Sequence, residues 1–204
     1  ATQFVYNSDL TAPTVAITVS GATNGAYGVA ATYVVTVTPS ESLSAVPTLS
    51  ITGGSITTAG ALSGSNYVYT ITPTDADEAM SLTIAINGAS DAAGNNNLVA
   101  SDSGSAFAWT HDATDPTITI TAAEANTGDT DNDATLALTF TLSEVATDFA
   151  AGDISVSGGA ISSFAGSGLT YTATFTPTAG ATDTTTIDVA AGAFTDAVGN
   201  DNSA

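Results

Sequence analysis

Short runs in which apolar and polar residues alternate recur along the whole chain. The clearest run spans 134–142, where threonines fill one face and the other face carries Leu136, Leu138, Phe140 and Leu142. A period of two, in runs rich in Thr, Val, Ile and aromatic residues and separated by Gly, Asn, Asp and Pro, is typical of half-buried β-strands. We find no convincing amphipathic helix. The pattern therefore predicts an all-β protein.

The spacing of these runs also indicates a fold class. In the second half of the chain we expect strands near 117–121, 134–142, 153–157, 160–164, 170–176 and 184–190. Gly64-Ser65 and Gly166-Ser167-Gly168 are expected to form hairpin turns. Six or seven short strands in roughly 100 residues predict a β-sandwich.

The chain contains an internal repeat, whose matching segments lie 103 to 105 residues apart. Two clear matches are Tyr67–Pro73 with Tyr171–Pro177 and Asp91–Asn95 with Asp196–Asn200. A period of this length fits one domain of ordinary size. We therefore predict two tandem domains, one over residues 11–111 and one over residues 112–204.

The frame of the repeat sets the first ten residues apart. The last strand of the first repeat is expected at Phe107-Ala108-Trp109-Thr110, and the chain opens with the similar segment Phe4-Val5-Tyr6. Phe4 lies 103 residues before Phe107, and Tyr6 lies 103 residues before Trp109. Residues 1–10 are therefore predicted to be the final strand of a preceding or neighbouring domain. Correspondingly, the second domain is predicted to lack its last strand within this chain.

Two arrangements of neighbouring copies would supply the last strand of the second domain. In a covalent tandem array, the next repeat provides it in cis. In a filament, Phe4, Val5 and Tyr6 of another subunit provide it in trans, by strand addition. Such a head-to-tail contact does not close on itself and builds a filament. The sequence leaves both arrangements open.

The charge balance restricts the partners of this chain. It has 20 acidic residues, no Lys or Arg, and a formal net charge of −20. Nucleic acid is excluded as a partner, because no side chain can neutralise phosphates, and an anionic membrane surface is equally disfavoured. Carboxylates without ammonium partners must be solvated, bound by backbone N–H groups or bound to cations, and hard oxygen ligands favour Ca²⁺.

Other features point to an exported protein. No apolar run approaches the length of a membrane span, and no signal peptide is visible, so we expect any export signal to lie outside this chain. The chain has no cysteine, which excludes disulfides and leaves calcium as a source of rigidity.

The second repeat resembles the immunoglobulin-like (Ig-like) repeats of giant bacterial surface adhesins, notably the extender repeats of RTX-type adhesins exported by type I secretion. The matching positions are Asp112, Thr114 and Pro116, then Ser143-Glu144, Phe149, Asp153-Ile154, Val156, Gly158-Gly159, Tyr171, Ala173, Phe175, Pro177, Ile187, Val189, Gly192, Phe194, Asp196 and Gly199-Asn200. The first repeat fits more loosely, with Asn87-Gly88 where the second has Ala191-Gly192. The resemblance implies an Ig-like fold, calcium at domain junctions and a spacer role on a bacterial surface, and it names no adhesion ligand.

Acidic residues are expected to gather at one pole of each domain, where the linker leading into the domain meets two loops. The first group is Asp9, Glu41 and Asp91, and the second is Asp112, Asp115, Glu144, Asp148 and Asp196. Asp77 is expected at the opposite pole of the first domain. A further candidate is the alternating set Asp129, Asp131 and Asp133, although it lacks the Gly and Glu that complete an EF-hand loop. The alternative is that these acids are solvated side chains of turns, since Asp is an ordinary turn former.

Catalysis and sugar binding are the remaining alternatives. His111 is the only imidazole and lies in the linker, where we expect its side chain to be exposed. A Ser-His-Asp site would have to use it, and no nucleophile elbow precedes a helix. Tyr67, Tyr69 and Trp109 would be a stacking platform for a carbohydrate, but their alternation favours core positions. We therefore predict a non-enzymatic extracellular module.

Overall fold

A computed structural model describes residues 3, 5, 8–98, 107–122, 135–179 and 185–204 of the chain. The chain divides into two compact units, residues 1–113 and 114–204. Within the described ranges the only helical element is the single 3-10 turn η1 (Ala151–Asp153), and every other element is a strand. The prediction of two tandem all-β sandwiches is confirmed.

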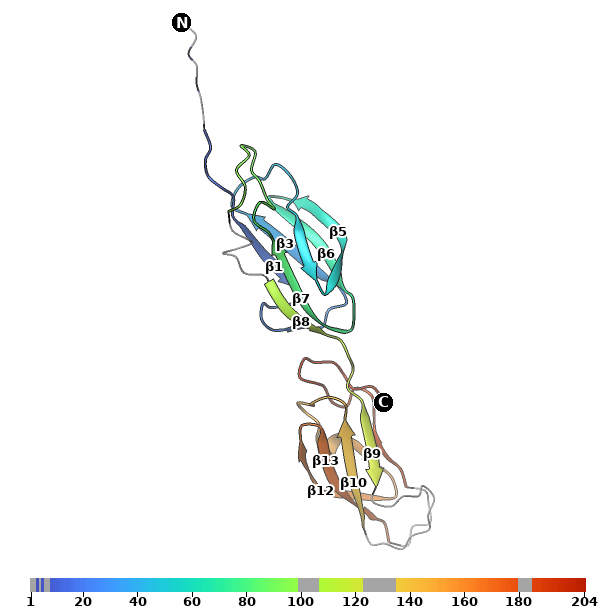
Figure 1. The fold of residues 1–204 in the computed structure, drawn as a ribbon. Coiled ribbons are helices and arrows are strands. Elements are labelled where there is room, and N and C mark those ends of the chain that lie inside the picture. Colours follow the sequence, from blue (N-terminus) through green and yellow to red (C-terminus); the bar gives the residue numbers. More distant parts are fainter. Residues whose placement is uncertain (1–2, 4, 6–7, 99–106, 123–134, 180–184) are drawn as a thin grey trace. The chain divides into compact units, whose positions relative to one another are not determined.

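Two four-stranded sheets form the first unit (Figure 1). One sheet has the order β1-β3-β6-β5, with β1 (Val15–Ser20), β3 (Tyr33–Pro39), β6 (Asn66–Pro73) and β5 (Gly54–Ser63), all antiparallel. The other has the order β2-β8-β7-β4, with β2 (Tyr27–Gly28), β8 (Phe107–Asp112), β7 (Asp77–Ile84) and β4 (Leu49–Thr52). Only the pairing of β2 with β8 is parallel.

The inward-facing residues of the alternating strands form the core of this unit. Tyr33, Val35 and Val37 of β3 are fully buried, and the residues between them face outward or are partly covered. The adjacent β6 contributes its own alternating set, of which Ile71 is fully buried. The tip of the β5–β6 hairpin lies at Gly64-Ser65, as predicted.

The second unit repeats the first sheet and part of the second. Its larger sheet has the order β12-β13-β10-β9, with β12 (Gly159–Ser167), β13 (Thr170–Pro177), β10 (Leu136–Leu142) and β9 (Ile118–Ala122). Its second sheet pairs β11 (Ile154–Val156) with β14 (Ile187–Val189). All six strands predicted for this half of the chain are present, with ends shifted by a few residues.

An aromatic cluster centred on Phe149 fills the core of the second unit. Its ring centroid lies 5.1 Å from the rings of both Tyr171 and Phe194, 5.6 Å from that of Phe164 and 5.9 Å from that of Phe140. Most of these pairs meet edge to face, the geometry that aromatic quadrupoles favour.

A buried asparagine fixes the loop that follows β7 and β14. In the first unit, Asn97 Oδ1 accepts the N–H of Ala89 at 2.8 Å, and its Nδ2 donates to the carbonyl of Ala85 at 2.9 Å. Asn202 does the same in the second unit, since it accepts from Phe194 N–H at 3.0 Å and donates to Ala190 O at 3.0 Å.

These bonds correct the expected alignment of the two repeats. Asn87 N–H donates to Asn97 O, and Gly192 N–H donates to Asn202 O, so Asn87 corresponds to Gly192 rather than to Ala191. Both residues have a left-handed backbone, with φ of 64° at Asn87 and 70° at Gly192. Asn and Gly are the residues that most readily adopt this conformation.

The two buried asparagines should contribute strongly to stability. We expect Asn97→Ala and Asn202→Ala each to lower the free energy of unfolding by about 2–4 kcal/mol, because backbone groups of the loop lose their partner while buried. Urea unfolding monitored by circular dichroism measures the effect. Asn96→Ala, at an exposed position in the same loop, is the control; equal effects at positions 96 and 97 would contradict the assignment.

Candidate functional site

Three carboxylates meet at one end of the first unit. Asp9 precedes β1, Glu41 follows β3 and Asp91 follows β7, and one oxygen of each lies within 4.8 Å of the others. Asp9 is exposed, Glu41 is half-buried and Asp91 is buried. The structure therefore brings together the three acids that the sequence assigned to this pole, and we call them the acidic cluster.

Asparagine and backbone groups hold Asp91 in its charged form. Asn95 donates to Asp91 twice, from its backbone N–H and its side-chain amide, each at 2.8 Å. The Asn95 amide, followed by backbone N–H groups that outweigh the effect of burial, lowers the pKa of Asp91 below its usual range. The same amide donates to the backbone carbonyl of Asp9 at 3.1 Å, which ties the incoming chain to this loop.

Glu41 has the opposite electrostatic environment. Burial, followed by the negative charges of Asp9 and Asp91, raises the pKa of the Glu41 carboxyl. The chain has no Lys or Arg that could offset this repulsion. Three hard oxygen donors with uncompensated charge fit the ligand preference of Ca²⁺.

Part of the same arrangement recurs in the second unit. Oxygens of Glu144 and Asp196 lie within 4.8 Å of each other. Asp196 Oδ1 accepts three backbone N–H bonds, from Val198, Gly199 and Asn200, at 2.7 to 2.9 Å. Burial opposes ionisation of Asp196, but these donors and the Asn200 amide outweigh it and hold its pKa below the usual range.

Asp148 and Asp77, two other predicted ligands, accept hydrogen bonds from backbone N–H groups. Asp148 accepts from the backbone N–H of Thr195 at 2.8 Å and from its hydroxyl at 3.3 Å, so this loop acid has a structural partner. Asp112 ends β8 opposite Asp77 of β7, whose Oδ1 accepts from the N–H of Ala113 at 3.3 Å.

Two further predictions are separate from the acidic cluster. Asp115 is exposed in the segment before β9. Asp129, Asp131 and Asp133 lie outside the described residues, as do Phe4 and Tyr6, whereas Val5 is described and exposed.

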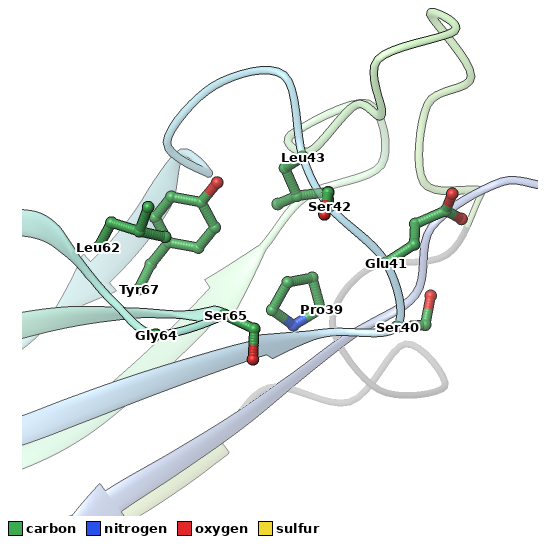
Figure 2. A pocket seen from close by; sticks show the side chains of 9 residues that line it. All are labelled: Pro39, Ser40, Glu41, Ser42, Leu43, Leu62, Gly64, Ser65 and Tyr67. Atoms are coloured by element: carbon green, nitrogen blue, oxygen red, sulfur yellow. The ribbon is translucent and has the colours of Figure 1, made fainter.

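A shallow hollow of about 330 Å³ lies beside the acidic cluster. Pro39, Leu43, Leu62 and Tyr67 are among the residues that line it. Figure 2 shows the Glu41 carboxylate pointing away from Leu62 and Tyr67. Glu41 also lines the hollow, so the hollow and the acidic cluster share this residue.

His111 is buried, and the prediction of an exposed linker side chain is wrong. It lies in β8 with 3% of its surface exposed. Its Nδ1 is 2.8 Å from the Tyr33 hydroxyl and 3.1 Å from the carbonyl oxygen of Gly28. The strand alternation that buries Trp109 continues two residues further and carries His111 into the core.

The aromatic residues considered as a sugar platform are core residues. Tyr67, Tyr69 and Trp109 are each at least nine-tenths buried. The Tyr69 hydroxyl donates to Pro47 O at 2.6 Å, and burial raises the pKa of Tyr69 to about 12. Because these rings pack inside the sandwich, they offer no stacking face to a carbohydrate.

The fold and the repeated acidic loops define an Ig-like tandem module. A family model described as "Bacterial Ig-like domain" matches residues 9–107 and 112–204, and the chain belongs to this family. Neither a search of curated proteins nor a search of solved structures found a match. Domains of this family are typically extracellular and structural rather than catalytic. Within the described ranges no helix is long and apolar enough to cross a membrane.

The raised pKa of Glu41 predicts a pH-dependent effect of its removal. In metal-free buffer at pH 7, Glu41→Gln should increase the free energy of unfolding, because it removes a charge that burial and then the charges of Asp9 and Asp91 disfavour. Because the pKa of Glu41 is raised in the folded state, just above pH 4.5 the folded state binds more protons than the unfolded state. The ionised Glu41 therefore begins to destabilise the fold as the pH rises through this range. The gain should therefore disappear near pH 4. Urea unfolding at both pH values measures it, with the exposed Asp75→Asn as control. A loss of stability at pH 7 would contradict the repulsion.

The burial of His111 predicts coupling to Tyr33. We expect His111→Ala to destabilise the first unit by about 2–4 kcal/mol, through a cavity and an unpaired phenol. A double-mutant cycle with Tyr33→Phe should give a coupling energy of about 0.5–3 kcal/mol. Thr110→Ala, at the exposed neighbouring position of β8, should change stability by less than about 0.5 kcal/mol. A His111→Ala effect as small as that of Thr110→Ala would argue for an exposed imidazole.

Proposed function

We propose that this chain is a calcium-stiffened spacer module of a bacterial surface adhesin. The observation that carries the proposal is the acidic cluster, because it places three carboxylates within 4.8 Å of one another in a chain without Lys or Arg. A divalent cation would neutralise this charge and join the segment entering the domain to two of its loops.

Asp9 gives the cation a mechanical role. It is the first residue of the first family match, and the Asn95 amide already holds its backbone carbonyl. A cation bound by Asp9, Glu41 and Asp91 would therefore fix the direction in which the preceding chain enters. Ordering such a joint restricts bending, which turns a chain of domains into a stiffer spacer.

The repeat extends this argument to the second domain. Asp112 lies 103 residues after Asp9 in the sequence and begins the second family match, while Glu144 and Asp196 are counterparts of Glu41 and Asp91. We propose that these three residues hold an equivalent cation. One ion for each domain is then the expected stoichiometry.

The adhesin context rests on the resemblance to the extender repeats of RTX-type adhesins. Extracellular calcium is available at millimolar concentrations, the range in which extracellular modules bind it. The partners of such a module are neighbouring repeats of the same chain. The adhesion ligand would belong to another part of the surface protein.

Calcium titration tests the proposal. By isothermal titration calorimetry we expect about two Ca²⁺ per chain, with sub-millimolar to millimolar affinity. Glu41→Gln should abolish one site, and Glu144→Gln the other, whereas Asp75→Asn should abolish neither. Small-angle scattering in Ca²⁺ and in chelator should give a larger maximum dimension with Ca²⁺. Absence of binding at 10-fold the expected dissociation constant, or an unchanged dimension, would reject the calcium-stiffened spacer.

A filament subunit is the second candidate function. It is favoured by the incomplete burial of apolar residues in the second unit, where Ile118, Leu136 and Ile187 are only half-buried. A strand donated by another subunit would cover such residues. Unlike the spacer, this function predicts association of separate chains.

A further inference from the structure

The two units differ in how well they cover equivalent apolar positions. Strand register matches Tyr33 of β3 to Leu136 of β10, and Leu82 of β7 to Ile187 of β14. Tyr33 and Leu82 are fully buried, whereas Leu136 and Ile187 are half-buried. The same holds for the first strand, where buried Val15 and Ile17 correspond to half-buried Ile118 and Ile120.

In the first unit, β8 is the strand that accounts for this difference in burial. It pairs antiparallel with β7, placing Phe107 opposite Leu82 and Trp109 opposite Met80. The Trp109 ring lies 5.0 Å from the Tyr33 ring, edge to face. In the second unit β14 pairs with β11, and among the described residues no strand pairs with its other edge. An unpaired edge of this kind is a template for a further strand.

We propose that residues 3–9 of a second copy of this chain occupy this edge, antiparallel to β14. The repeat sets the register, with Phe4 opposite Ile187 and Tyr6 opposite Thr185, as Phe107 and Trp109 lie opposite Leu82 and Met80 in the first unit. Tyr6 then covers Leu136. The donor segment leads into its own first unit at Asp9, which belongs to the acidic cluster. The proposal rests on the second candidate function and identifies its partner.

The acceptor surface also discriminates between two possible strands. In the first unit the phenol of Tyr33 satisfies His111. The side chain of its counterpart Leu136 has no polar atom. A strand with the sequence of β8 would therefore bury its imidazole there without a hydroxyl partner. The N-terminal segment carries Ser8 at the position of His111, and a hydroxyl is smaller and bonds readily to nearby backbone. The second unit therefore favours the N-terminal segment.

Peptide binding to the full chain tests the acceptor. The receptor is the 204-residue chain with Phe4→Asp and Tyr6→Asp, which cannot donate its own strand. The probes are fluorescent peptides of residues 1–9 and 104–112, which have equal length and end in Asp9 and Asp112. By anisotropy we expect saturable one-to-one binding of peptide 1–9, at least 10-fold tighter than that of peptide 104–112. A variant of peptide 1–9 with Phe4→Asp and Tyr6→Asp tests the inward face of the strand. Its charge-matched control is the same peptide with Val5→Asp and Asn7→Asp, which are changed only on the outward face.

A substitution at Leu136 tests why the second unit prefers one peptide over the other. Leu136→Tyr in the receptor should narrow or reverse the preference, because the phenol can satisfy His111 of peptide 104–112. The comparison of the two peptides on the parent receptor stands even if this variant does not fold. Equal binding of both peptides, or binding of neither at 1 mM, overturns the proposal.

Sedimentation of the unmodified chain separates this proposal from the filament function. Linear oligomers of the unmodified chain would support both the filament function and the proposed acceptor, provided that they depend on the inward face of the donor strand. The double variant Phe4→Asp with Tyr6→Asp should then abolish them, and Val5→Asp with Asn7→Asp should not. Selective peptide binding by a chain that stays monomeric supports the acceptor and rejects only the filament. A native polypeptide much heavier than 19.9 kDa under denaturing conditions, whose second unit binds no peptide, shows instead that the strand is supplied in cis.

Discussion

Charge compensation without cationic side chains constrains the loops of this protein. Its 20 acidic residues face no Lys or Arg, so the groups that stabilise a buried carboxylate are N–H donors. Asp196 shows how this works, because three backbone N–H groups and an asparagine amide surround it. Glu41 is the opposite case, since burial, followed by the neighbouring carboxylates, raises its pKa. This contrast is the physical basis for the cation that we propose at this pole of the domain.

The loop that carries Asp91 in the first unit and Asp196 in the second is built alike in the two units. Both loops begin from a left-handed residue, hold an aspartate by N–H donors and end on a buried asparagine. These bonds are local, so each loop keeps its shape whatever fills the core beside it. The carboxylates are thus held in place before any ion binds, which lowers the entropic cost of binding.

The cores, by contrast, are built differently. In the first unit the aromatic rings gather around β8, where Trp109 contacts Tyr33 and Phe107. In the second unit they gather around Phe149, on strands and loops that lie within residues 140–194. Among the described residues the second core has no counterpart of β8 and is still substantial, and the positions that such a strand would cover are the half-buried ones.

The sequence by itself determined the strands, the repeat and the grouping of Asp9, Glu41 and Asp91, because alternation and period are local properties and equivalent loops of a repeat meet at the same pole. Only the tertiary structure decided the hydrogen-bond partner of His111 and the equivalence of Asn87 and Gly192 in the two repeats. Alternation places His111 on the inward face of β8, but only the fold brings Tyr33, 78 residues earlier in the chain, within hydrogen-bonding distance of it. Asn87 matches Gly192 because both satisfy the backbone of a buried asparagine. Such long-range partners leave no periodic signal in the sequence.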